Sequence, residues 1–206
     1  MSGDDAQDLE VRRLLEEVGA LRRGHFLLTS GRHSDGYVQC ARLFERPEAA
    51  ERAADLLARR LAPLLREEVD AVAGPALGGV ILGYLLARRL GARALYAERE
   101  EGALRLRRGF ALEPGERVVV AEDVVTTGGS VGELIELARA AGARVLAVAA
   151  VADRSGGAVR FDVPAAFGAR LDLPSWPAGD CPLCRRGLPV ERPGSRHLGA
   201  AANGTA

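Results

Sequence analysis

The chain has 206 residues, of which 48% are hydrophobic and 27% are charged. This length and composition exclude a disordered chain and a small domain that depends on disulfides. The 28 basic residues balance the 28 acidic ones, so no net charge draws the chain to nucleic acid or to anionic lipid. All of the basic residues are arginine, which excludes a lysine Schiff base and a P-loop lysine.

The cysteine count and the first residues indicate a cytoplasmic protein. Three cysteines, Cys40, Cys181 and Cys184, are too few for a disulfide scaffold and suit a reducing compartment. The N-terminal residues are acidic rather than basic and apolar, so we expect no secretory signal. The longest apolar run, 71–87, is interrupted by glycines and a proline, which favours a strand-to-helix loop over a membrane span.

Hydrophobic periodicity predicts alternating helices and strands. The first half is expected to contain a helix over 8–23, a strand–turn–strand over 26–40, a helix over 47–65, a strand over 69–73 and a helix over 80–90. The second half is expected to contain a strand over 94–97, a charged loop over 98–104, a ribbon at 104–106, a strand over 117–121, a helix over 131–141 and a strand over 145–151. Strands that alternate with helices predict an α/β fold with a parallel sheet. The Gly- and Ala-rich stretch 191–206 is expected to be a disordered tail.

The stretch 118–130 carries the clearest sign of chemistry. A buried strand ends in two adjacent carboxylates, Glu122 and Asp123, and a loop rich in hydroxyls and glycine then opens a helix. Ligands of open parallel sheets bind at the carboxyl ends of the strands. Loop amides and a helix N-terminus suit a phosphate group, and carboxylates suit sugar hydroxyls. We therefore expect a sugar phosphate; the structural alternative is a tight turn capped by Ser130.

The run from Val119 to Ser130 resembles the phosphoribosyl-pyrophosphate (PRPP) motif of the type I phosphoribosyltransferases. Segments 25–34, 74–79 and 152–157 resemble the orotate-specific branch of that family, and the resemblance covers roughly 9–190. It implies transfer of the phosphoribosyl group from PRPP to orotate, giving orotidine 5'-monophosphate and pyrophosphate, with Mg2+ carried by PRPP.

The resemblance also implies an architecture. A central parallel sheet flanked by helices is expected in one phosphoribosyltransferase domain over 1–190, with a small hood from about 9–45 and 160–190. A homodimer is expected, in which each mobile loop reaches over the site of the partner. Nucleic acid and membrane are not expected as partners.

Site residues follow from the same resemblance. The PRPP-binding residues that it implies are Glu122, Asp123, Val124, Val125, Thr126, Thr127, Gly128, Gly129, Ser130, Gly78 and Gly79. Glu122 and Asp123 match the acidic pair that binds the ribose hydroxyls, and with Arg99 they are the expected catalytic residues. Thr126 and Arg154 match the residues that bind orotate, whose carboxylate an arginine can pair bidentately. A salt bridge to Asp153 is the structural alternative for Arg154.

The stretch 98–109 departs from the family pattern. Many relatives carry lysines and a histidine in a mobile catalytic loop there, whereas this chain has only arginines. Arginine stabilises a departing pyrophosphate but is a poor proton donor. We expect a mobile lid in which Arg99 contacts the pyrophosphate, while Arg105, Arg107 and Arg108 lie mostly on a solvated face.

The remaining candidates leave alternatives open. Cys181 and Cys184 form a CxxC pair, which is half of a tetrahedral zinc site that a homodimer could complete, or a redox pair, or, as the favoured interpretation, two idle thiols. His25, His33 and His197 show no metal-ligand spacing, so no metal ligands are expected from protein side chains. Transfer to another base, or a PRPP-sensing regulator without turnover, are the alternative functions.

Overall fold

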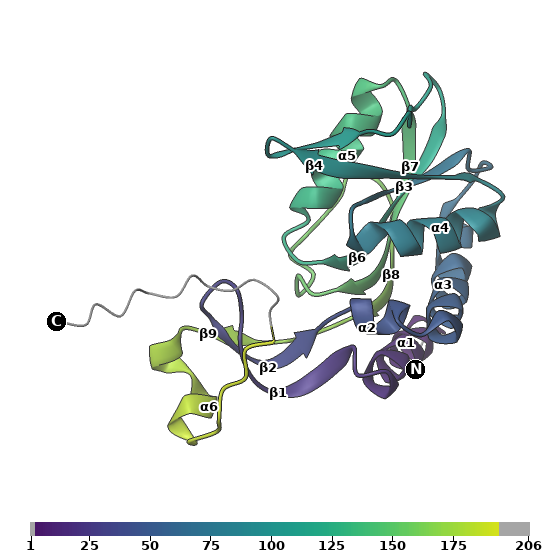
Figure 1. The fold of residues 1–206 in the computed structure, drawn as a ribbon. Helices are drawn as coiled ribbons and strands as arrows, with labels where there is room; N and C mark the ends of the chain where they lie inside the picture. Colours follow the sequence, from purple (N-terminus) through teal and green to yellow (C-terminus); the bar gives the residue numbers. More distant parts are fainter. Residues whose placement is uncertain (1–2, 194–206) are drawn as a thin grey trace. The chain divides into compact units, whose positions relative to one another are not determined.

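The computed structural model describes residues 3–193 in two compact units. The core unit comprises residues 3–20 and 39–172, and the hood unit comprises residues 21–38 and 173–193. Both are coloured by sequence in Figure 1. No helix among the described residues is long and apolar enough to cross a membrane.

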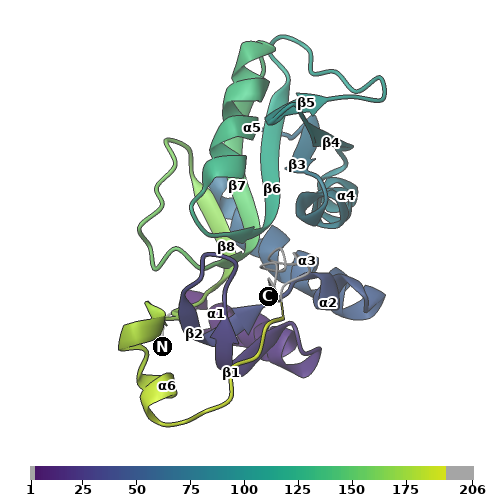
Figure 2. The same cartoon turned by 60° about the vertical axis from the view of Figure 1, so that its left-hand side comes forward.

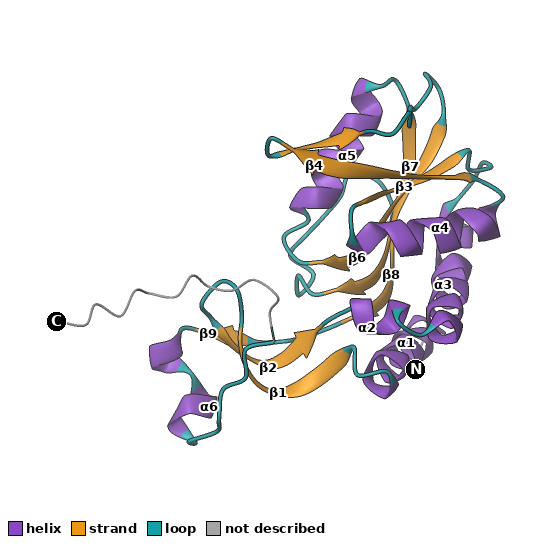
Figure 3. Cartoon of the chain, in the orientation of Figure 1, coloured by secondary structure: helices purple, strands orange, loops and turns teal. Residues whose placement is uncertain are grey.

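The core unit is built on a six-stranded sheet. Its elements are α1 (Gly3–Glu17), α2 (Ala41–Phe44), α3 (Pro47–Leu61), η1 (Ala62–Leu64), β3 (Ala71–Pro75), α4 (Gly78–Leu90), β4 (Arg93–Glu100), β5 (Ala103–Leu106), β6 (Arg117–Val125), α5 (Gly129–Ala140), β7 (Arg144–Asp153) and β8 (Ala165–Arg170). The strand order is β5-β4-β3-β6-β7-β8. All neighbours pair in parallel except β4 and β5. The α/β fold with a parallel sheet is therefore confirmed (Figure 3).

Helices cover both faces of this sheet, which explains why its central strands are apolar along their whole length. On β3, Ala71 and Ala73 belong to the apolar cluster that includes Leu134 and Ile135 of α5. Val72 points to the opposite face, where it lies near α4. Figure 2 shows α5 and α4 on either side of the strands. The continuous apolar runs in the sequence thus mark strands that are buried on two sides.

The structure differs most from the predicted elements at three places. The first helix ends at Glu17 instead of continuing to residue 23, because Gly19 adopts a positive φ of 69° and a strand begins at Leu21. The charged stretch 98–104 is not a loop: β4 and β5 form an antiparallel hairpin there. The strand expected over 117–121 continues to Val125. The helix predicted from Pro47 and the strand predicted over 145–151 are confirmed.

The hood unit is a small antiparallel sheet with an irregular C-terminal segment. Its elements are β1 (Leu21–Leu27), β2 (His33–Val38), β9 (Ser175–Trp176), η2 (Ala178–Asp180) and α6 (Pro182–Arg185). The strand–turn–strand predicted over 26–40 corresponds to β1 and β2, which pair with each other, and β9 adds to β2. The C-terminal segment also pairs with β1, since Leu27 donates its N–H to the carbonyl of Glu191 at 2.8 Å.

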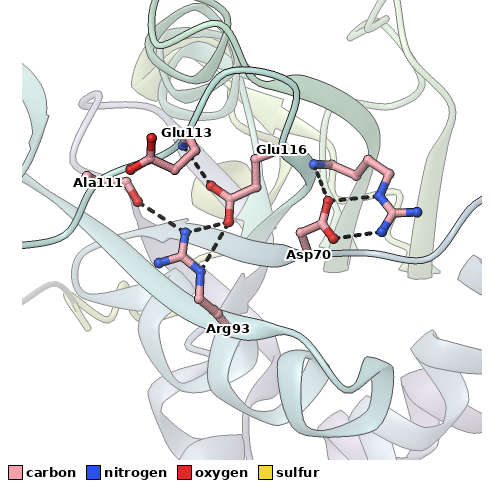
Figure 4. A network of polar contacts seen from close by, with 6 residues as sticks. Asp70, Arg93, Ala111, Glu113 and Glu116 are labelled. Carbon is pink, nitrogen blue, oxygen red and sulfur yellow. Dashed lines mark hydrogen bonds and ion pairs between the residues drawn. The ribbon is translucent and has the colours of Figure 1, made fainter.

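The amino ends of the core strands are joined by charged pairs. The carboxylate of Asp70, just before β3, accepts hydrogen bonds from the backbone N–H and the guanidinium of Arg117, at 2.7–2.8 Å. These bonds hold the pKa of Asp70 well below its usual range. Beside them, Arg93 of β4 pairs with Glu116, which also accepts the N–H of Glu113 (Figure 4). Ion pairs therefore hold together the end of the sheet at which the parallel strands β3, β4 and β6 begin.

Candidate active site

A pocket lies at the carboxyl end of β6, where the sequence predicts a phosphate site. It is a small open depression lined by Glu122 and by residues 124–131. Gly128 has a φ of 74°, and a Cβ at this position would lie 2.7 Å from Val159. Only glycine therefore fits this turn. α5 begins at Gly129 in the lining of the pocket, so the positive end of its helix dipole lies at the pocket.

Two carboxylates stand at the edge of this pocket. Glu122 is only 8% exposed. Burial, reinforced by the neighbouring Asp123, raises the pKa of Glu122 to about 8. Its Oε1 accepts the N–H of Asp123 at 3.0 Å, and Asp123 Oδ1 accepts the N–H of Val124 at 2.7 Å. Placing two acids here is costly unless a ligand interacts with them.

The loop after β3 packs directly against the end of β6. A Cβ on Gly78 would lie 2.4 Å from the carboxyl carbon of Asp123, and one on Gly79 would lie 2.7 Å from the carbonyl oxygen of Ala121. These glycines therefore let the first turn of α4 approach the acidic pair without an intervening side chain. The structure thus brings Gly78 and Gly79 close to the acidic pair, although Gly78 and Glu122 are 44 positions apart in the sequence.

Arg154 lies at the neighbouring strand end. It directly follows β7, and its N–H donates to the carbonyl of Val125 at 2.8 Å, which fixes it beside the end of β6. The carboxylate of Asp153 accepts the N–H of Ser155 at 2.8 Å. Asp153 is buried and organises this turn. Arg154 is therefore held at the same edge of the sheet as the pocket.

Arg99 is held by a different element. Its Nη2 lies 2.9 Å from Glu133 Oε2 on α5, and Glu133 also accepts the backbone N–H of Leu104 in β5. These two bonds, that of Leu104 first, lower the pKa of Glu133. Glu133 thus fastens both strands of the hairpin to α5. The structure places Arg99 in this contact and not in the lining of the pocket.

The other hairpin arginines are also in ion pairs. Arg107 lies 3.1 Å from Glu100, Arg108 lies 2.8 Å from Glu98, and Arg105 contacts Glu100 at a longer 3.6 Å. All three side chains are more than half exposed. The expected solvated face is confirmed.

A second cluster in the hood unit was missed by the sequence reasoning. His25, His33, Cys181 and Cys184 each place a ligand atom within 4.8 Å of the others. The CxxC pair and the two histidines on adjacent strands were the available signal for a shared site. Most of the chain separates the histidines from the cysteines, so their spacing in the sequence does not show that they meet. His197 and residues 194–206 of the expected tail lie outside the described residues.

Comparison with known proteins places the chain in a class and then in a family. A model of the phosphoribosyl transferase domain matches residues 40–178, so the pocket belongs to a phosphoribosyltransferase fold. The orotate phosphoribosyltransferase of Thermotoga maritima is 56% identical over 189 residues, which are 91% of this chain and 99% of that protein. That of Heliobacterium modesticaldum is 54% identical over 190 residues, 91% of this chain and 97% of the relative. The chain belongs to the orotate phosphoribosyltransferase family.

Solved structures show the same relationship. The crystal structure of orotate phosphoribosyltransferase from Aeropyrum pernix has a TM-score of 0.64 at 33% identity, covering 78% of this chain and 93% of that one. The adenine phosphoribosyltransferase of Rhodothermus marinus has a TM-score of 0.61 at 21% identity, covering 78% of this chain and 99% of that chain. The second likeness shows that the fold is shared by enzymes for different bases.

Proposed function

We propose that the protein transfers the phosphoribosyl group of PRPP to orotate, giving orotidine 5'-monophosphate and pyrophosphate in pyrimidine synthesis. The observation that carries the proposal is the acidic pair of buried Glu122 and half-buried Asp123 beside a phosphate-type loop at one sheet edge. The high identity with orotate phosphoribosyltransferases of similar length supports the choice of substrate.

In this proposal PRPP lies along the end of β6. The amides and hydroxyls of residues 126–130, with the N-terminus of α5, bind the 5'-phosphate. Glu122 and Asp123 bind the ribose hydroxyls. Since the pKa of Glu122 is about 8, its carboxyl is mostly protonated at neutral pH and can donate a hydrogen bond to a hydroxyl oxygen. Asp123 then accepts one.

The pyrophosphate lies toward the first turn of α4. Gly78 and Gly79 let this turn lie directly against Asp123, where a side chain at Gly78 would collide, so that its backbone N–H groups can approach the pyrophosphate. Carboxylate and phosphate oxygens are the ligands that Mg2+ prefers, so the acidic pair fits a cation brought by PRPP. When bound, Mg2+ neutralises charge that develops on the leaving pyrophosphate.

Orotate enters beside Thr126 and Arg154. The guanidinium of Arg154 pairs with the orotate carboxylate, which holds N1 against the ribose C1. The C–O bond to pyrophosphate breaks as the new C–N bond forms, and the ribose passes through an oxocarbenium-like state. The N1–H bond of orotate also breaks, and its proton passes to the departing pyrophosphate. The side chains contribute positioning and charge stabilisation.

The hairpin over 98–109 acts as the lid in this proposal. Arg99 exchanges Glu133 for the pyrophosphate when PRPP binds, and in a homodimer the hairpin reaches over the partner's site. The exposed ion pairs of the hairpin exchange at little cost, which supports a movable element.

The direct test is the loss of orotate absorbance when PRPP and Mg2+ are added to the purified protein. Matched reactions with adenine or hypoxanthine in place of orotate test the base. We expect turnover with orotate and no turnover with adenine or hypoxanthine. Turnover with a purine and not with orotate would contradict the assignment of Arg154, and absence of turnover with every base, together with tight PRPP binding, would indicate a sensor.

A further inference from the structure

The hood unit carries four side chains that the proposed reaction does not use. His25 of β1, His33 of β2, and Cys181 and Cys184 at α6 each direct one ligand atom to a common point. We propose that this cluster binds one zinc ion in a tetrahedral site, and that the ion holds the hood unit together.

The distances between the ligand atoms support a single ion. Sγ of Cys181 and Sγ of Cys184 lie 3.5 and 3.6 Å from His25 Nε2, and Cys184 Sγ lies 3.2 Å from His33 Nδ1. Zinc bonds of about 2.0–2.3 Å imply tetrahedral edges of about 3.3–3.8 Å between ligand atoms. The two ring nitrogens are 2.7 Å apart, so an ion needs them to separate by only about 0.6 Å.

The surroundings of His25 prepare it as a ligand. Its Nδ1 lies 2.9 Å from the carbonyl oxygen of Leu188. Since a carbonyl only accepts hydrogen bonds, Nδ1 carries the proton and Nε2 turns its lone pair toward the cluster. Metal-bound histidines are commonly oriented by such a contact. Leu188 is in turn fixed, because its N–H donates to the carbonyl of Leu183 at 3.1 Å.

Burial and charge also suit zinc. His25, His33 and Cys181 are buried, whereas Cys184 is exposed and leaves a path by which an ion can enter. Two thiols lose their protons on binding, and the two thiolates neutralise the dication. The site is then neutral overall, which lowers the cost of burying it.

A zinc ion would also explain how so small a unit is stable. The hood unit consists of two short segments, and Phe26 is the large apolar side chain that is fully buried among its described residues. Units of this size usually need a metal or disulfides. The proposed ion joins both strands of the hairpin to the C-terminal segment, with His25 and Cys181 lying 156 positions apart.

The first experiment measures metal in the full-length protein. We expect about one zinc per chain by mass spectrometry of the purified, reduced protein. After removal of zinc, titration with Co2+ should give the visible bands of a tetrahedral ion and a thiolate-to-cobalt charge-transfer band, and added zinc should abolish both. Half an equivalent of metal would instead indicate a site shared between two chains and would overturn the single-chain site.

Variants then assign the ligands. Cys181→Ser and His33→Asn should each lose zinc and the cobalt spectrum, whereas Cys40→Ala, which removes the cysteine of the core unit, should keep both. If Cys181→Ser fails to fold, the cobalt spectrum of the unaltered protein still decides the question. A folded, reduced protein that binds neither metal, or one in which a Cys181–Cys184 disulfide is the stable state, would overturn the proposal.

Discussion

Burial leaves the Glu122 carboxyl largely protonated at neutral pH, since its pKa is about 8 instead of 4.5. The neutral form is therefore favoured in the folded protein. Its contribution to stability is fully present below about pH 4.5 and is lost as the pH rises through about 8. A bound cation would reverse this preference, because it stabilises the charged acid.

We therefore expect the unliganded protein to lose unfolding free energy between about pH 5 and pH 8, the interval between the two pKa values of Glu122. Glu122→Gln should flatten this slope and stabilise the protein at pH 8, while lowering kcat at least tenfold. Urea unfolding at several pH values measures the slope. Glu136→Gln, at an exposed position of α5, is the control; equal slopes in all three proteins would contradict the raised pKa.

Arg154 allows a second test at the residue scale. Arg154→Ala should raise the KM for orotate by an amount that corresponds to about 2–5 kcal/mol, and should leave the KM for PRPP within a few-fold. Arg160→Ala, an exposed arginine in the same connection, is the matched control. Equal losses for both substrates would show that Arg154 supports the fold or the phosphate site.

The β4–β5 hairpin shows, at the scale of elements, what the sequence could and could not reveal. The acidic pair and the phosphate-type loop are contiguous over residues 122–130, so their order along the chain already predicts a site. The hairpin depends on Glu133, which contacts Arg99 34 positions away. Charge density alone suggested a loop, because local polarity does not show pairing between strands.

Glu133 is expected to control the hairpin. Glu133→Ala removes the acceptor of Arg99 and of the Leu104 N–H, so trypsin should cleave the hairpin several-fold faster than in the unaltered protein. PRPP with Mg2+ should slow cleavage of the unaltered protein if the hairpin closes over its ligand as proposed. Glu136→Gln should behave as the unaltered protein does. Cleavage that is unaffected by ligand would contradict a lid.

Arg99 itself should act during turnover. Arg99→Ala is expected to lower kcat more than it weakens PRPP binding in the ground state, because charge develops on the pyrophosphate as it leaves. Steady-state kinetics and direct PRPP binding measure the two effects. Arg105→Ala, which removes an exposed arginine of the same hairpin, should change neither by more than a few-fold.

At the scale of the whole molecule, the two ends of the strands in the core sheet carry different kinds of residues. The carboxyl ends of β3, β6 and β7 carry the glycines, the acidic pair and Arg154, which are candidate ligands of substrate. The amino ends carry Asp70 and Arg117, which bind each other through both backbone and side chain. Changes at the second end should alter stability without altering substrate binding.

Asp70→Asn tests this separation. The pKa of Asp70 is depressed by its bonds with Arg117, so its contribution to stability is present above the ordinary pKa and is lost as the pH falls. The variant should lower Tm at pH 7, and the difference should shrink toward pH 3 while KM values stay unchanged. Glu68→Gln, at a side chain that is 94% exposed, should melt as the unaltered protein does.

The division of the hood unit between two distant segments has a consequence for synthesis on the ribosome. β1 and β2 emerge early, but the residues that pair with them, Trp176 and Glu191, are translated only after the entire core unit. While β3 to β8 are being synthesised, the hairpin of β1 and β2 therefore lacks the segments that pair with its two edges. The strands of the core unit can pair with one another before the second hood segment is made, whereas the hood unit can be completed only after Glu191 has been translated.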